Sequence, residues 1–266
     1  MSGASLIHPT AIVDPGAELD SSVRVGPYAI IERDVRIGAN TTIGAHCVIA
    51  SGTTIGRDNV FHPFGSIGGP PQDKKYAGEP TTLVIGNGNT FREYVTINRG
   101  TVQDRGRTDV GDDNWIMAYV HIAHDCVVGN HTILANTTNL AGHVVLGDWV
   151  ILGGFTGVHQ FCKIGAHAMT AVGTVVLHDL PPYVMASGTP ANAHGLNSEG
   201  LRRRGFDAQR IQELRRAYKT LYKRGLGLEE ARAELAAQQA AASGESAADL
   251  ALMLEFLGGV TRGIVR

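Results

Sequence analysis

The sequence is poor in the residues that mark several common protein classes. Its 266 residues are only 6% aromatic, and its three cysteines, Cys47, Cys126 and Cys162, lack the CxxC spacing of a metal site. An odd number of thiols without that spacing predicts reduced, buried side chains in an intracellular protein. Such a low aromatic content also disfavours a packed β-sandwich.

Excess charge and long apolar runs are absent as well. The formal net charge is −2 at pH 7, so bulk electrostatics predict no nucleic-acid partner. No run approaches the ~20 apolar residues that span a membrane, and the first ten residues have neither the basic stretch nor the apolar centre of a signal peptide. We therefore expect a cytoplasmic protein with no integral membrane segment.

The sequence is rich in glycine, with 34 residues, and its apolar residues recur with a strict period of six positions. An apolar residue occupies every sixth position from Ile7 to Ile67, and again from Val110 to Val176, with Thr170 as the one polar member. A period of six fits neither a helix nor a simple strand, and it is typical of a parallel β-helix built from triangular coils of 18 residues. A glycine commonly follows the apolar residue, and we expect these glycines at corners that need an unusual φ: Gly26, Gly38, Gly44 and Gly56.

Two polar segments interrupt the period. Ile67 and Ile85 are 18 residues apart, so the segment of about 68–84 is predicted to be a loop from a single coil that keeps the phase. After Ile97 the period restarts at Val110 with its phase moved by one residue, so about 98–109 is predicted to be a true insertion. Polar loops on a regular scaffold usually cover or complete a site.

The repeat ends at Leu180-Pro181-Pro182, since proline cannot donate to a sheet ladder. Past residue 207 the apolar spacing becomes helical, with Asp207 as a candidate N-cap and two further helices at about 228–240 and 246–257. The predicted fold is mainly β: a β-helix over residues 1–190 with two protruding loops, followed by a small α-helical C-terminal domain over residues 191–266.

Polar residues gather in the second half of the repeat. Residues 18 apart lie one above another at about 4.8 Å. His124, Gly142 and Gln160 therefore form one column, and Asp125 and His143 belong to the next. A histidine beside a carboxylate is a candidate general base, and the amide of a glycine can stabilise an oxyanion. The remaining histidines predicted to face solvent without a role are His8, His46, His62, His131, His167 and His178.

Several longer motifs carry a family resemblance over essentially the whole chain. HIAHDCVVGN (121–130), LAGHV, HQFC, IGAH, PPYV and EGLRRRGF resemble the acyl-ACP:UDP-N-acetylglucosamine O-acyltransferases that begin lipid A synthesis, as do IGGPPQDKKYAGEPT and VTINRGT. The resemblance implies a left-handed β-helix, a homotrimer, and transfer of an (R)-3-hydroxyacyl group from acyl carrier protein to the 3-hydroxyl of UDP-N-acetylglucosamine. It implies no cofactor and no metal.

The resemblance also implies residue roles. His124 is the general base, Asp125 orients it, and the Gly142 amide stabilises the oxyanion. The acyl-length channel includes Met169 and Val172. Residues implied to bind substrate are Gln72, Asp73, Lys75, His121, His143, His159, Gln160, Asn197, Glu199, Arg203 and Arg204.

One departure from the family concerns the length of the acyl chain that is transferred. Some long-chain members have glycine where this chain has Val172, and some have histidine where it has Pro190. A valine shortens an apolar slot in which each methylene contributes about 0.8 kcal/mol, so we expect a preference for shorter 3-hydroxyacyl chains. Arg215 and Arg216 lie in a basic run that is either a solvated helix face or a docking patch for the acidic carrier protein.

Two other classes of function compete with the acyltransferase. A zinc hydratase on the same fold would hold its metal with histidines such as His121, His124 and His143. Their expected neighbours Asn139 and Gln160 suit a sugar and a carbonyl better. A purely structural β-helix would need neither the His124–Asp125 pair nor the two polar loops.

Overall fold

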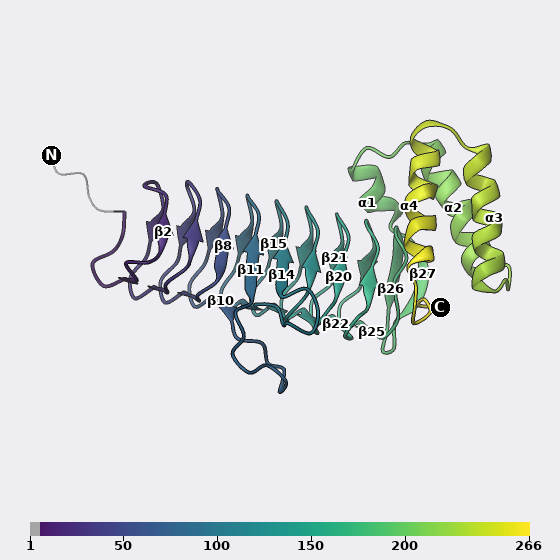
Figure 1. Cartoon of the computed structure of the whole chain (residues 1–266). Helices are drawn as coiled ribbons and strands as arrows, with labels where there is room; N and C mark the ends of the chain where they lie inside the picture. The colour runs from purple at the N-terminus through teal and green to yellow at the C-terminus, as the bar shows by residue number, and fades with distance from the viewer. Residues whose placement is uncertain (1–5) are drawn as a thin grey trace.

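The computed structural model describes residues 6–266, and its strands follow the six-residue period. Most strands are two residues long, with an outward residue followed by a buried one, as in β3 (Arg24–Val25). The buried apolar residues fill the inside of a triangular prism, which confirms the predicted left-handed parallel β-helix of hexapeptide repeats. Figure 1 shows the prism with its coils in sequence order and the helices gathered at its C-terminal end.

Three parallel sheets form the faces of the prism. Sheet I contains β1 (Ile12–Val13), β4 (Ile30–Ile31), β7 (Val48–Ile49), β10 (Ser66–Gly69), β13 (Thr96–Asn98), β16 (His121–Ile122), β19 (Asn139–Leu140), β22 (Gly157–Val158) and β25 (Val175–Val176). Sheet II contains β2 (Glu18–Leu19), β5 (Arg36–Ile37), β8 (Thr53–Ile55), β11 (Thr82–Ile85), β14 (Arg107–Val110), β17 (Val127–Val128), β20 (Val145–Leu146) and β23 (Lys163–Ile164).

Sheet III ends in an antiparallel hairpin formed by β26 and β27. The sequence did not predict this hairpin. Sheet III contains β3, β6 (Thr42–Ile43), β9 (Val60–Phe61), β12 (Thr90–Phe91), β15 (Trp115–Ile116), β18 (Ile133–Leu134), β21 (Ile151–Leu152), β24 (Met169–Thr170), β26 (Val184–Ser187) and β27 (Asn192–Leu196).

The first polar segment belongs to one corner and not to a full coil. Ile67 pairs with Ile49 and Ile97 in sheet I, whereas Ile85 pairs with Ile55 in sheet II. The chain therefore uses 18 residues where a corner and one strand need six, and the 12 extra residues keep the phase because 12 is a multiple of six. The segment is therefore a loop that keeps the phase, as the sequence predicted.

The glycines after the apolar residues have a different role from the one expected. Eighteen non-glycine residues, at the third position after the buried residue, have φ between 55° and 69°, while Gly26, Gly38, Gly44 and Gly56 do not have positive φ. A Cβ on Gly44 would lie 2.6 Å from the carbonyl oxygen of Phe61 in the next coil. These glycines are needed because successive backbones approach closely.

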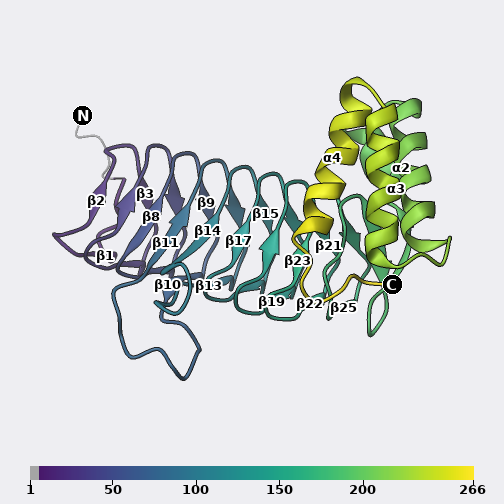
Figure 2. The same cartoon turned by 45° about the vertical axis from the view of Figure 1, so that its right-hand side comes forward.

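The C-terminal domain contains four helices: α1 (Ser198–Arg203), α2 (Ala208–Tyr222), α3 (Leu228–Ala241) and α4 (Gly244–Gly258). Asp207 caps α2 as predicted, because its Oδ1 accepts the Arg210 amide at 2.8 Å. Figure 2 shows α4 beside the last coils, where Leu252 and Phe256 face Val145 and Pro182 across a shared hollow. Within residues 6–266, no helix combines the length and apolar character needed to cross a membrane.

All three cysteines are free and buried, as expected. Burial raises the pKa of Cys126 to about 12 and that of Cys162 to about 11. These thiols therefore stay protonated at neutral pH and are poor nucleophiles.

The close approach of coils predicts a stability difference between two glycine-to-alanine variants. Gly44→Ala forces its Cβ into the next backbone and should lower the free energy of unfolding by about 1–3 kcal/mol. Gly157→Ala is the matched control, because its Cβ meets no atom within 4 Å, and it should change stability by less than about 0.5 kcal/mol. Urea unfolding at equal protein concentration measures both, and equal losses would contradict the explanation.

Candidate active site

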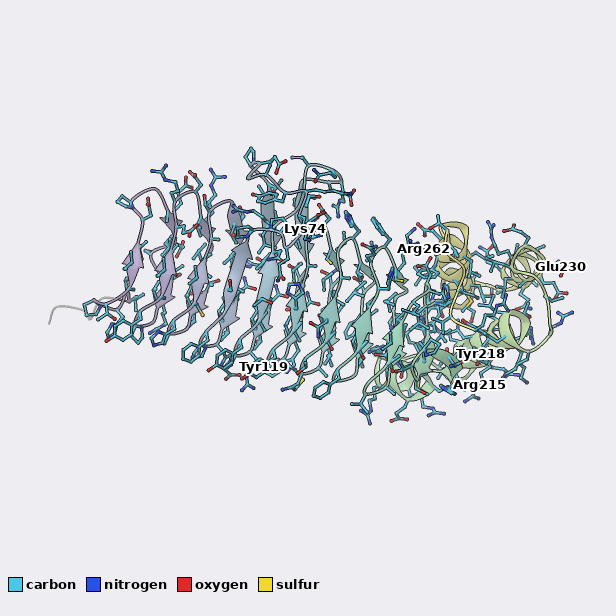
Figure 3. The ribbon with its side chains drawn as sticks, turned by 90° about the horizontal axis from the view of Figure 1, so that it is seen from below. Lys74, Tyr119, Arg215, Tyr218, Glu230 and Arg262 are labelled. Atoms are coloured by element: carbon cyan, nitrogen blue, oxygen red, sulfur yellow. The ribbon has the colours of Figure 1, made fainter. Side chains whose placement is uncertain are left out.

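The corner between sheets I and II, here called the I–II edge, carries both insertions and the predicted histidines. The segments 70–81 and 99–106 leave this edge, and so do the corners at 123–126, 141–144 and 159–162. Figure 1 shows both loops projecting from the same side of the prism. In Figure 3, Lys74 of the first loop lies on that side, while Tyr119 lies on the opposite edge.

His124 and Asp125 form a hydrogen-bonded pair at this edge. His124 Nδ1 is 2.8 Å from Asp125 Oδ2, and the carboxylate is fully buried. Thr101 holds the carboxylate from the second loop, with its amide at 2.9 Å and its hydroxyl at 2.6 Å, and the Asp125 amide donates to Thr108 Oγ1 at 2.8 Å. Because a carboxylate accepts, Nδ1 carries the hydrogen and Nε2 remains available as a base.

The imidazole of His124 lies directly over Gly142. A Cβ at Gly142 would be 2.6 Å from His124 Cε1 and 2.7 Å from Nε2, so no other residue fits beneath the ring. The structure thus brings the predicted column together. The Gly142 amide donates no hydrogen bond to any group in residues 6–266, and it stays available beside the His124 ring.

Two further histidines flank this pair. His143 stacks on Phe161 with ring centroids 4.3 Å apart, and its Nδ1 is 2.6 Å from Asp104 Oδ2. His121 Nδ1 is 2.8 Å from Thr96 Oγ1. Burial, together with the nearby His124, lowers the pKa of His121 from its usual value, which favours a neutral ring.

Sequence analysis missed the partners that hold these groups: Thr96, Thr101, Asp104 and Thr108. Thr101, Asp104 and Thr108 lie within the predicted loop of about 98–109 and follow no repeat. The only available signal was the expectation that this insertion completes a site.

The C-terminal tail also reaches this edge, which the sequence did not indicate. Arg262 Nη1 donates to the Gln160 carbonyl at 3.1 Å and lies 3.4 Å from His159 Nδ1. Its guanidinium is 5.6 Å from the centre of the Phe161 ring. Figure 3 shows Arg262 on the same side of the prism as Lys74. His159 and Gln160 therefore lie on the predicted edge with a cation beside them.

The predicted residues Gln72, Asp73 and Lys75 lie in the first loop, on the I–II edge but nearer the N-terminus. Asp73 Oδ1 accepts the Lys75 amide at 2.9 Å and shapes a local turn. Gln72 and Lys75 are exposed.

The second predicted binding group lies on another edge of the same prism, between sheets II and III. Asn197 caps α1 and donates to the His167 carbonyl at 3.1 Å. Arg204 donates to His167 Nδ1 at 3.1 Å and lies 5.2 Å from the centre of the Trp149 ring. The remaining members, Glu199 and Arg203, form an exposed ion pair.

His167 is therefore not the solvent-facing histidine without a role that the sequence predicted. Burial, reinforced by Arg204, lowers its pKa to about 4. The hydrogen bond agrees with this value, because an arginine N–H needs the lone pair of an unprotonated Nδ1.

The residues predicted to form the acyl channel lie on neither of these two edges. Met169 lines a mostly apolar cavity of about 260 Å³ with Met185 and His194 on sheet III. Val172 is 74% exposed on the edge between sheets III and I. Another apolar groove, of about 380 Å³, runs along sheet I from His121 past Gly157 to Val175.

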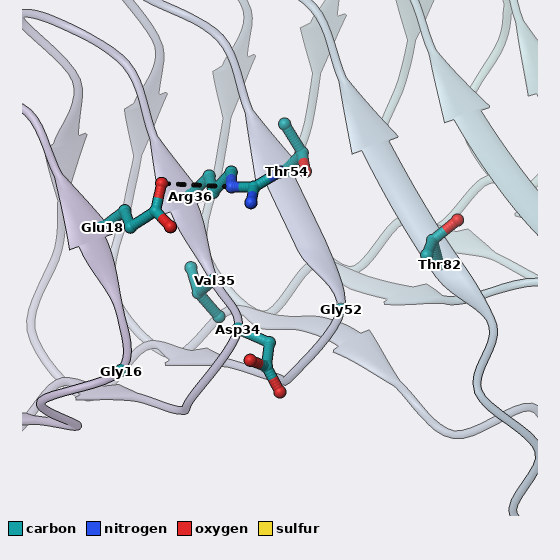
Figure 4. Close-up of a pocket in the computed structure, with 8 residues that line it drawn as sticks. All are labelled: Gly16, Glu18, Asp34, Val35, Arg36, Gly52, Thr54 and Thr82. Atoms are coloured by element: carbon teal, nitrogen blue, oxygen red, sulfur yellow. Dashed lines mark hydrogen bonds and ion pairs between the residues drawn. The ribbon is translucent and has the colours of Figure 1, made fainter.

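A further hollow of about 230 Å³ lies on sheet II in the first coils (Figure 4). Its charged lining includes the Glu18–Arg36 ion pair, with the two side chains 3.1 Å apart, and Asp34. It contains none of the predicted site residues.

The central cluster also contains a candidate set of metal ligands. Ligand atoms of His124, Asp125 and His143 lie within 4.8 Å of one another. However, the Nδ1 of each histidine is already hydrogen-bonded to a carboxylate, at 2.8 Å for His124 and 2.6 Å for His143. Two ligand atoms of a tetrahedral zinc with bonds of about 2.0–2.1 Å would be farther apart than these pairs, so only the Nε2 atoms of the two rings are left to bind a metal. The geometry is that of two histidine–carboxylate pairs.

The basic run of the C-terminal domain is paired only in part with the domain's own acids. Arg216 binds Glu213 at 3.1 Å, and Arg224 pairs with Glu234. Arg215 is exposed, and no ion pair joins it to another residue in the described part of the chain.

Comparison with known proteins agrees with this geometry. A family model described as UDP N-acetylglucosamine O-acyltransferase, domain 2, matches residues 179–265, and a model of bacterial transferase hexapeptide repeats matches residues 107–142. The chain is 63% identical to the acyl-[acyl-carrier-protein]–UDP-N-acetylglucosamine O-acyltransferase of Janthinobacterium sp. (strain Marseille), with 98% of this chain and 100% of that protein covered. The protein of the same name from Thiobacillus denitrificans is also 63% identical, with 98% and 99% covered.

Solved structures give the same result. LpxA from Acinetobacter baumannii superposes with a TM-score of 0.94 at 47% identity, covering 98% of this chain and 100% of that one. The structure of UDP-N-acetylglucosamine O-acyltransferase (LpxA) from Moraxella catarrhalis has the same TM-score at 45% identity, again with 98% and 100% covered.

The depressed pKa of His167 predicts a pH dependence of stability. Between pH 6.5 and about 4 the unfolded chain binds a proton at this histidine that the folded chain excludes, so stability falls as pH falls through that window. NMR titration of the ring should show a midpoint near pH 4. His167→Gln should flatten the loss of thermal stability over the same range, and an unchanged slope would contradict the assignment.

Proposed function

The chain belongs to the acyl-[acyl-carrier-protein]–UDP-N-acetylglucosamine O-acyltransferases, and we propose that it performs their reaction by direct attack at the I–II edge. It is an acyltransferase of lipid A biosynthesis, which moves an acyl group from acyl carrier protein to UDP-N-acetylglucosamine. The zinc hydratase alternative is not favoured. In our proposal the donor carries an (R)-3-hydroxyacyl group and the sugar 3-hydroxyl accepts it.

His124 Nε2 acts as the general base in this proposal. It removes the proton from the sugar hydroxyl as the oxygen attacks the thioester carbonyl, and buried Asp125 stabilises the imidazolium that forms. The Gly142 amide stabilises the tetrahedral oxyanion. When the intermediate collapses, the carbon–sulfur bond breaks and His124 returns its proton to the thiol of the carrier protein. No metal or covalent acyl-enzyme takes part.

One observation carries this mechanism. The His124 Nδ1–Asp125 Oδ2 bond of 2.8 Å and the close contact of the ring with Gly142 support a base and an oxyanion donor that act side by side. Positioning of this kind can supply much of the rate enhancement for a reaction between two bound substrates.

The substrate-binding residues support a shared site between copies of the chain. His124 and the first loop lie on the I–II edge, the Arg204 group on the II–III edge, and Met169 and Val172 beyond it. One prism cannot close all three around a single substrate. A cyclic homotrimer of parallel prisms lets an edge of one copy face another edge of its neighbour. We propose that the nucleotide-sugar site combines the two edges in this way.

The remaining parts of the proposal follow from the same arrangement. The acyl chain enters apolar surface that includes the Met169 cavity, and Val172 limits its length. Arg215 and Arg216 are offered as a docking patch for the acidic carrier protein. The reaction takes place in the cytoplasm, a compartment consistent with three free thiols.

Removing the base should remove the activity. His124→Ala is expected to lower kcat by about 10²–10⁴-fold, the usual contribution of general acid–base catalysis. His62→Gln is the control, because His62 also lies near a carboxylate, Glu93 at 3.5 Å, but on the edge between sheets III and I. Mass spectrometry of the product formed from UDP-N-acetylglucosamine and 3-hydroxyacyl carrier proteins, with and without chelator, measures both. Full activity of His124→Ala would overturn the mechanism.

A shared site also predicts complementation between inactive chains. His124→Ala and Arg204→Ala should each be strongly impaired, whereas trimers that contain both chains should recover about a third of the wild-type sites, since one of their three interfaces pairs two intact edges. Co-expression with two affinity tags isolates the mixed trimers. His124→Ala mixed with Asp125→Asn is the control, because both defects lie on one edge and no recovery is expected. A mixture with only the summed separate activities would contradict a shared site.

A further inference from the structure

Asp104 connects the second loop to a histidine two corners away. Its Oδ2 is 2.6 Å from His143 Nδ1, although the residues are 39 apart in sequence. The His143 side chain is 15% exposed and that of Asp104 is 39% exposed. The loop is also anchored at Thr101, whose amide and hydroxyl both bind Asp125. The insertion therefore contacts each of two neighbouring histidine–carboxylate pairs.

His143 is held on three sides. Phe161 stacks on one face of the ring at an interplanar angle of 10°, and His124 approaches edge-on with ring centroids 5.0 Å apart. The charged groups around it are Asp104, Asp125 at 3.9 Å, and Arg262 on the Phe161 ring. Asp125 already accepts three shorter hydrogen bonds, so Asp104 is the main partner of His143 Nδ1.

We propose that Asp104 is a positioning residue for His143, which fixes the Nδ1–H tautomer and leaves Nε2 as an acceptor for a donor group of the nucleotide sugar. A carboxylate can only accept, so its partner nitrogen must carry the hydrogen. The ring is fixed by the Phe161 stack. The Nε2 atom of His143 can then accept a hydrogen bond from a hydroxyl or an amide N–H of the acceptor substrate. This inference rests on the proposed function, together with the substrate-binding role that the family resemblance implies for His143.

An exposed ion pair without functional effect is the competing explanation, because many such pairs contribute nothing measurable. Two features argue against it. The pair is short, and its histidine is mostly buried between an aromatic ring and the catalytic imidazole. A test must therefore separate an effect through His143 from a general effect on the loop.

The first test reads the tautomer directly and needs no turnover. Ring ¹⁵N shifts of His143, assigned with His143→Gln, should show the Nδ1–H form in the wild type. In Asp104→Ala they should move toward the Nε2–H form that free histidine prefers. Arg105→Gln is the matched control in the same loop, because Arg105 pairs with Asp109 at 2.8 Å and not with a histidine. An unchanged tautomer in Asp104→Ala overturns the proposal, even if the acyltransferase mechanism holds.

The second test is a kinetic double-mutant cycle. Asp104→Ala should raise KM for UDP-N-acetylglucosamine about three- to tenfold with kcat changed by less than about twofold, as expected for one weakened hydrogen bond. Asp104→Asn, whose carbonyl oxygen can still accept, should restore most of the affinity. In a His143→Ala background, Asp104→Ala should have no further effect.

Additive effects in the cycle, or an Arg105→Gln change as large as that of Asp104→Ala, would mean that Asp104 acts through the loop and would overturn the proposal. A changed tautomer with unchanged KM would overturn the substrate contact. Melting curves of every variant show that the fold is intact. Failure of the wild type to acylate UDP-N-acetylglucosamine would instead overturn the proposed function.

Discussion

The stacking of 18-residue coils at one strand spacing is the constraint on which the rest of the structure depends. Each coil hydrogen-bonds to the next along all three faces, for example between His121 and Asn139 in sheet I. Outside the two insertions, a residue of the prism therefore lies directly above the one 18 positions earlier. Glycines such as Gly44 allow this spacing where two backbones would otherwise meet a side chain. The same constraint sets His124 over Gly142, so the scaffold determines the relative position of these two residues.

The two insertions modify this scaffold at one edge only. They add 12 and seven residues at the corner between sheets I and II, and the strands after them return to register. Because the coils on either side continue to stack, the extra residues must lie outside the prism, where they can fold over the histidines. Thr101 shows the consequence: a loop residue supplies two of the hydrogen bonds that hold the buried Asp125.

The sequence predicted what is periodic and missed what is not. The coil length, the His124–Asp125–Gly142 group and the Asp207 cap follow from spacing, because a fixed repeat converts sequence offsets into neighbours. The same logic predicted a loop that keeps the phase at residues 67–85, but not that the loop occupies one corner between sheets I and II. It also misassigned the glycines, since corner φ values are carried by residues such as Tyr28 and Asp125. Thr101, Asp104 and Arg262 reach the site through a loop and a tail, and no repeat indicates where those segments fold. The edge on which Arg204 lies could not be predicted, because it depends on where α1 packs against the prism.

The division between coil and loop explains how such a site can be adjusted without loss of the fold. His124 and Gly142 belong to stacked corners, where a substitution disturbs the contacts of the next coil. Asp104 belongs to a loop, and its side chain is 39% exposed. A change there alters the hydrogen bonding of His143 at little cost to the stacking. The proposed base and oxyanion donor are thus fixed by the constraint that builds the prism, while the loop contact proposed to tune substrate binding lies in a segment free of it.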